Sequence, residues 1–108
     1  MATHAASDAV LDALGEPTRR QVLELLRDGP RAVGEIAAEL PVSRPAVSQH
    51  LRVLRGAGLV RERRDGTRHL YSIDAHGLTA LRTYLETLWD DALAAFAATA
   101  DEERGDAP

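Results

Sequence analysis

Residues 33–73 read VGEIAAELPVSRPAVSQHLRVLRGAGLVRERRDGTRHLYSI, and this stretch decides the fold. Apolar residues at positions 33, 36, 37 and 40 are spaced as on one side of a short helix, which Pro41 ends. Ser43 is a good N-cap for a second helix, and apolar residues at 47, 51 and 54 mark its buried side. The stretch therefore predicts two helices joined by a three-residue break at 41–43.

The spacing of apolar residues changes from helical to strand-like after residue 58. Residues 59–64 and 67–73 predict two strands around Asp65-Gly66, a dipeptide typical of tight hairpin turns. Arginines surround this turn on both strands. A helix-turn-helix followed by a basic hairpin is a geometry for reading duplex DNA, because a helix fits the major groove and a basic loop reaches the flanking backbone or minor groove.

The start of the second helix carries side chains that suit contacts with bases and phosphates. Arginine pairs with guanine, glutamine pairs with adenine, and serine donates to either bases or phosphates. The N-terminus of the helix adds backbone N–H groups and a partial positive charge. The candidate DNA-binding residues are Ser43, Arg44, Pro45, Ser48, Gln49 and Arg52 on the helix and Arg61, Arg63, Arg64 and Arg68 on the hairpin.

Helices are predicted on both sides of this motif. Ser7 or Asp8 would cap a short helix that ends at Gly15, and Glu16-Pro17 would begin another that ends at 28–30. Asp74 would cap a long helix over about 75–100, whose apolar residues alternate three and four apart. This helix is too apolar for one edge of a small monomer, so we expect one flank to face the domain's own core and one to face a partner chain.

Length and composition limit the function classes. A chain of 108 residues has room for one domain, which we place at 8–100, with a flexible start at 1–7 and a disordered acidic tail at 101–108. No cysteine is present, which excludes disulfides, thiolate metal sites and cysteine nucleophiles. No apolar run is long enough for a transmembrane helix, and the first residues lack the features of a signal peptide, so we expect a cytoplasmic protein.

The formal net charge of −4 hides an uneven distribution. All 13 basic residues are arginine, and residues 42–68 hold seven of them against two acidic residues. Exposed charges more than about 8–10 Å apart are largely screened at physiological salt, so acidic residues elsewhere need not cancel this basic region. The negative net charge is therefore compatible with nucleic-acid binding.

Five sequence blocks, in the family's order and spacing, resemble the ArsR-type winged-helix repressors. The blocks are 14–20 (LGEPTRR), 43–51 (SRPAVSQHL), 57–60 (AGLV), 64–66 (RDG) and 70–71 (LY), and the resemblance covers about residues 8–100. It implies a mostly α winged helix-turn-helix with a small β-hairpin wing, a homodimer formed through the first and last helices, and a palindromic operator in double-stranded DNA. The implied dimer-interface residues are Val10, Leu11, Leu14, Leu81, Leu85, Leu88, Trp89, Ala92 and Phe96.

Many members of that family sense metals, but the usual ligand positions are not filled here. The helix that holds their thiol motif has no cysteine. Asp74-Ala75-His76 resembles part of a second site, yet counting from Tyr71 puts the family's ligand positions on Ala75 and Gly77. We therefore expect no metal and no cofactor, with Asp74 as a helix cap, and the last helix resembles the metal-independent branch. Its Tyr84, Trp89 and Phe96 would either line the pocket of an unidentified effector or, as we favour, serve the core and the dimer interface.

An enzyme is not expected. Ser48 and His50 are two residues apart on a helix and face different directions, and no phosphate-binding glycine loop or carboxylate cluster is present. The sequence therefore favours a DNA-binding transcriptional regulator, most simply a repressor. Two alternatives stay open, a metal-responsive repressor and a winged helix that binds proteins rather than DNA.

Overall fold

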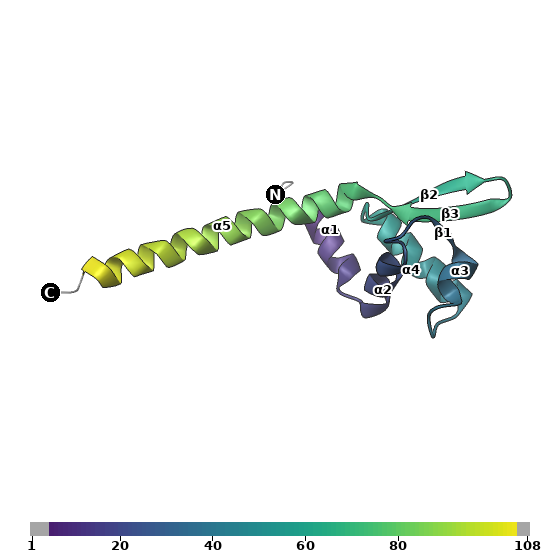
Figure 1. Ribbon diagram of the computed structural model, residues 1–108, viewed down its shortest axis with the longest axis horizontal. Helices are drawn as coiled ribbons and strands as arrows, with labels where there is room; N and C mark the ends of the chain where they lie inside the picture. The colour runs from purple at the N-terminus through teal and green to yellow at the C-terminus, as the bar shows by residue number, and fades with distance from the viewer. Residues whose placement is uncertain (1–4, 106–108) are drawn as a thin grey trace.

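The computed structural model describes residues 5–105 and confirms a mostly helical chain with a small antiparallel sheet. Figure 1 shows a compact set of short helices beside a hairpin and one long helix that leaves them. The strands lie in the order β1-β3-β2. The elements are α1 (Ala5–Leu14), α2 (Pro17–Leu25), β1 (Arg31–Ala32), α3 (Val33–Ala37), α4 (Arg44–Gly56), β2 (Val60–Asp65), β3 (Arg68–Ile73) and α5 (Ala75–Gly105).

The starts of α2 and α4 follow from local chemistry. The side chain of Glu16 accepts a hydrogen bond of 3.0 Å from the backbone N–H of Arg19, and Pro17 occupies the first turn. Ser43 Oγ accepts one of 3.2 Å from the N–H of Ala46, which confirms the predicted cap of α4. The preceding helix is shorter than predicted, because α3 ends at Ala37 and a turn leads from there to Ser43.

The hairpin turn lies one residue later than predicted. Asp65 pairs with Arg68 across the two strands, so the loop consists of Gly66 and Thr67. Gly66 has a φ of 64°, and among residues 5–105 only glycines have a positive φ. A left-handed glycine in the first position of a two-residue loop is typical of a type II′ turn, whereas Asp65-Gly66 as the loop would require a left-handed aspartate.

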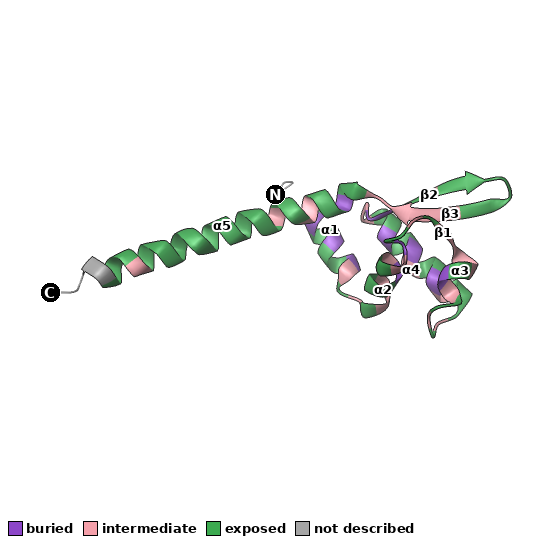
Figure 2. Ribbon diagram, viewed as in Figure 1, coloured by how far each residue is buried: buried purple, intermediate pink, exposed green. Residues whose placement is uncertain are grey.

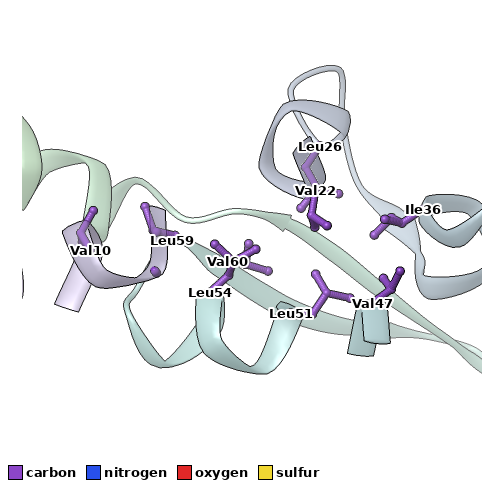
Figure 3. Packing of buried hydrophobic residues seen from close by; sticks show 10 residues of the cluster. Val10, Val22, Leu26, Ile36, Val47, Leu51, Leu54, Leu59 and Val60 are labelled. Atoms are coloured by element: carbon purple, nitrogen blue, oxygen red, sulfur yellow. The ribbon is translucent and has the colours of Figure 1, made fainter. Parts of the chain in front are cut away.

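The core of the domain lies between α1, α2, α3, α4 and the base of the hairpin. Figure 3 shows side chains of α4 pointing toward those of α2 and α3. Strand β1, which sequence reasoning missed, pairs with β3 through Arg31↔Tyr71 and Ala32↔Leu70. The buried apolar residues are Val10, Ala13, Val22, Leu26, Ile36, Val47, Leu51, Leu54, Leu59 and Val60.

The long helix α5 is anchored only near its start. The N–H of Asp74 donates to the Leu59 carbonyl oxygen at 2.9 Å, and the N–H of Gly77 donates to that of Gly58 at 2.7 Å. Asp74 Oδ1 accepts a 3.0 Å hydrogen bond from the N–H of His76, as expected for a cap. From residue 85 to residue 99 every position is exposed, which Figure 2 shows as an almost continuous green helix. The inward part of the predicted split is confirmed, because the first turns of α5 pack on α1 and Leu81 packs on the core, whereas the contact with a partner chain stays a prediction.

Both predicted ends of the domain need correction. Helix α1 already begins at Ala5, and Ser7 lies within its first turn as a buried residue rather than in a flexible start. Helix α5 continues to Gly105, so residues 101–105 are helical and not a disordered tail. Alanine and glutamate are strong helix formers, and no glycine or proline interrupts the chain between 78 and 104. The remaining residues of the two predicted ends, 1–4 and 106–108, lie outside the described part of the chain.

Candidate nucleic-acid interface

The two sides of α4 differ sharply in burial. Val47, Leu51 and Leu54 have exposed fractions of 1% or less. Arg44, Ser48 and Arg52 recur every four residues and are exposed, so they form one stripe that flanks the buried side. All ten predicted DNA-binding residues are exposed, namely Ser43, Arg44, Pro45, Ser48, Gln49, Arg52, Arg61, Arg63, Arg64 and Arg68.

One hydrogen bond already organises the polar stripe of α4. Arg52 Nη1 donates to Gln49 Oε1 at 2.7 Å. The bond uses one of the two lone pairs of Gln49 Oε1 and leaves the second lone pair and both amide N–H groups for other contacts. Gln49 can therefore make the expected two-point contact with adenine while Arg52 stays bonded to it.

The arginines of the hairpin do not lie on one face of it. Side chains alternate along a strand, so Glu62 and Arg64 share the face toward α4 while Arg61 and Arg63 point the other way. Arg68 forms an ion pair with Glu35 of α3. The hairpin therefore presents arginine on both faces, an arrangement suited to insertion between two phosphate backbones rather than to lying flat on one.

A carboxylate joins the hairpin to α4. Glu62 Oε2 accepts a 2.8 Å hydrogen bond from Arg55 Nη1, and Glu62 Oε1 accepts one from the Nδ1–H of His69. The hydrogen bond from His69, together with the charges of His69, Arg55 and Arg64, lowers the pKa of Glu62. Burial raises the pKa of Tyr71, the residue directly opposite Glu62, and the charge of Glu62 adds to this rise.

Sequence reasoning did not single out Arg55 or Glu62. A signal for Arg55 was available, because it follows Ser48 by seven residues and so falls on the exposed side of the helix. No comparable signal existed for Glu62, since its partners depend on the register of the strands. Together with Ser48, Leu51, Arg52 and Tyr71, these two residues line a crevice of about 250 Å³ between α4 and the hairpin.

His50 and His76 each lie beside a carboxylate and outside the polar stripe of α4. His50 is half-buried, and its Nδ1 lies 3.7 Å from Glu16 Oε2 at the start of α2, away from the polar stripe. The side chain of His76 is 94% exposed beside the capping Asp74. Among residues 5–105 no three histidine, aspartate or glutamate side chains come together as a metal ion requires. In the same part of the chain no helix is both long and apolar enough to cross a membrane.

The predicted dimer-interface residues divide into three groups by burial. Val10 has an exposed fraction of 0% and belongs to the domain's own core, which leaves no surface for a partner. Helical spacing predicts that a residue is buried, but not by which chain. Leu14 and Leu81 are half-buried against that core, and the six other residues are exposed: Leu11, Leu85, Leu88, Trp89, Ala92 and Phe96.

Comparison with known proteins identifies the family. The model of the bacterial regulatory protein arsR family matches residues 16–62, from the start of α2 into β2. The chain is 51% identical over 106 residues to the HTH-type transcriptional regulator Rv2034 of Mycobacterium tuberculosis, covering 98% of this chain and 99% of that one. The chain belongs to the ArsR family. It is accordingly a transcriptional regulator with a winged helix-turn-helix, and not an enzyme.

Two further relatives carry informative names. The transcriptional repressor SdpR of Bacillus subtilis is 37% identical over 65 residues, which cover 60% of this chain and 72% of SdpR. The Mb0332 fragment 1–100 of Mycobacterium bovis, described as a homodimeric winged helix-turn-helix DNA-binding domain, superposes with a TM-score of 0.64 at 34% identity. That match covers 80% of each chain.

Proposed function

We propose that this ArsR-family protein is a repressor that binds a palindromic operator in double-stranded DNA as a homodimer. Helix α4 enters the major groove, and the wing, residues 60–73, contacts the flanking backbone or minor groove. The observation that carries the proposal is the uncovered polar stripe of α4, with Arg44, Ser48 and Arg52 exposed beside an arginine-bearing hairpin. The names of SdpR and of the Mb0332 domain support the same function.

The dimer is proposed from the uncovered apolar face of α5. Leu85, Leu88, Trp89 and Phe96 have exposed fractions of 49%, 53%, 65% and 73%. They line or continue a groove of about 730 Å³ between Leu78 and Ala92. A contiguous apolar face of this kind on a small domain marks an interaction site, and a second copy of α1 and α5 would cover it. The aromatic side chains then serve the interface rather than an effector pocket.

We further propose that regulation is independent of metal and takes place in the cytoplasm. Support for the first point comes from Gly77, which occupies one of the ligand positions expected for the family. A Cβ at Gly77 would lie 2.8 Å from the carbonyl oxygens of both Ala57 and Gly58, so a ligand-bearing side chain does not fit there.

A selection of binding sites from random duplex DNA tests the proposal. We expect a two-fold symmetric site. If each subunit neutralises about four phosphates, a plot of the logarithm of the binding constant against the logarithm of the salt concentration should have a slope of about −7 for the dimer. A protein that binds DNA only weakly and without salt dependence would instead be a protein-interaction module. An operator affinity that shifts with zinc or nickel and returns with a chelator would make it a metal-responsive repressor.

A further inference from the structure

The wing needs a support beyond its own two strands. Residues 61 and 63–69 are exposed, and an isolated two-stranded hairpin is marginally stable in water. At its base, Val60 is buried in the core and β1 pairs with β3 through Leu70 and Tyr71. Two ion pairs link the hairpin to the helices: Glu62–Arg55 joins it to α4 at the level of Tyr71, and Arg68–Glu35 joins it to α3 next to the turn.

The carboxylate of Glu62 is well placed to hold the wing. Its side chain is only 21% exposed, whereas that of Arg55 is 61% exposed and that of His69 is 46% exposed. One oxygen bonds to the recognition helix and the other to β3, so a single group joins three elements. Arg52, Arg64 and Tyr71 are the other charged or titratable groups around it, and among these only Tyr71 is uncharged at neutral pH.

A negative charge at this place requires an explanation. It lies at the crevice between α4 and the wing, close to where DNA phosphates would pass, and it would repel them. Only two acidic residues occur among residues 42–68, and Glu62 is one of them. The repulsion between Glu62 and the DNA phosphates would be offset if the carboxylate holds the arginines that bind DNA in place.

We propose that Glu62 is a positioning residue that fixes the wing at one angle to α4, so that both meet a single operator half-site together. The proposal rests on the proposed function. By holding Arg55 and His69, Glu62 sets the distance between the polar stripe of α4 and Arg64 on the same side of the wing. Operator binding requires that distance to match the groove spacing, whereas non-specific binding does not.

The test compares Glu62→Gln with Glu24→Gln, a matched loss of one negative charge at an exposed position of α2. For the full chain, affinity is measured for the selected operator and for a scrambled duplex. We expect Glu62→Gln to lower the ratio of operator to scrambled affinity by about twofold to fivefold, as for a partly exposed charged contact, and Glu24→Gln to leave it unchanged. In an Arg55→Gln background, Glu62→Gln is expected to lower the ratio less.

Wing motion in the free protein provides a second readout. The heteronuclear ¹⁵N NOE of the Gly66 amide should fall in Glu62→Gln and stay at the wild-type value in Glu24→Gln. If both DNA affinities rise equally and the NOE is unchanged, Glu62 acts only as a repelling charge and the proposal is overturned. If the wild-type protein selects no operator, the proposed function fails, and an unchanged NOE would separately overturn the positioning role.

Discussion

Gly77 is the position where one methyl group should matter most for the placement of α5. A Cβ added there would lie 2.8 Å from the carbonyl oxygens of Ala57 and Gly58 and 2.9 Å from the Gly58 carbonyl carbon. All three atoms are backbone, so no side chain can rotate to make room.

The expected cost of Gly77→Ala follows from two opposing effects. Overpacking against fixed backbone costs about 1–3 kcal/mol, whereas alanine in a helix gains about 0.5–1 kcal/mol over glycine. We therefore expect a net destabilisation of about 1–2 kcal/mol. In a chain of this size each kcal/mol lowers Tm by about 4–8 °C, so the variant should melt about 5–15 °C below the wild type.

The control is Gly56→Ala, near the end of α4. Among residues 5–105 no atom outside its immediate surroundings lies within 4 Å of the added Cβ, so we expect unchanged or slightly raised stability. Both variants are compared by thermal and urea unfolding at one protomer concentration, because a dimer's Tm depends on concentration. A Gly77→Ala protein that melts at or above the wild type would refute the close approach of α5 to Gly58.

Five further variants test exposed side chains and hydrogen bonds of the structure. Arg44→Ala should cost about 1–3 kcal/mol of operator affinity and relax specificity at one base pair, while Arg63→Ala, on the face of the wing away from α4, should weaken operator and scrambled DNA alike, both measured by fluorescence anisotropy. Leu85→Glu, at a side chain 49% exposed, should yield a folded monomer by light scattering, and an unchanged dimer would contradict the α5 interface. Arg19→Ala removes hydrogen bonds of 2.6 and 3.3 Å to the carbonyl oxygens of residues 13 and 12 and should lower the free energy of unfolding by about 1–3 kcal/mol in urea. The hydrogen bond from the His76 N–H lowers the pKa of Asp74 in the folded protein. The stabilisation by this cap should therefore be complete above the ordinary aspartate pKa of about 3.9, and it should be lost as the pH falls through the lower pKa of the folded state. The unfolding curves of the wild type and of Asp74→Asn should then converge in acid.

Local chemistry accounts for the parts of the fold that were predictable. Ser43 caps α4 because its hydroxyl reaches an N–H three residues on, a contact contained within the sequence itself. Strand β1 was not predictable, because two residues become a strand only through pairing with Tyr71 and Leu70. The turn shifted by one residue because Gly66 can take either loop position, and only the pairing of Asp65 with Arg68 decides between them.

The candidate site shows the same division between local and long-range information. Helical spacing predicted which side of α4 is exposed, and all six predicted DNA-binding residues on or beside that helix are exposed. It did not predict that Arg68 is paired with Glu35 or that Arg55 is paired with Glu62, because each pair joins separate elements. The wing arginines therefore differ in how readily they could bind a phosphate, because Arg68 would first have to leave, or share, the carboxylate of Glu35.

The distribution of charge along the molecule explains how an acidic protein can present a basic surface. The molecule is 74 Å long, and Figure 1 shows the wing and the end of α5 at opposite extremes. Acidic residues at 90, 91 and 101–103 are exposed on the distal part of α5, far from the arginines of α4 and the wing. The screening length at physiological salt is about 8 Å, so these acids contribute little to the potential that a phosphate meets at the wing. The net charge of −4 therefore describes the whole chain, whereas the local potential at α4 and the wing is set by the seven arginines and two acidic residues of residues 42–68.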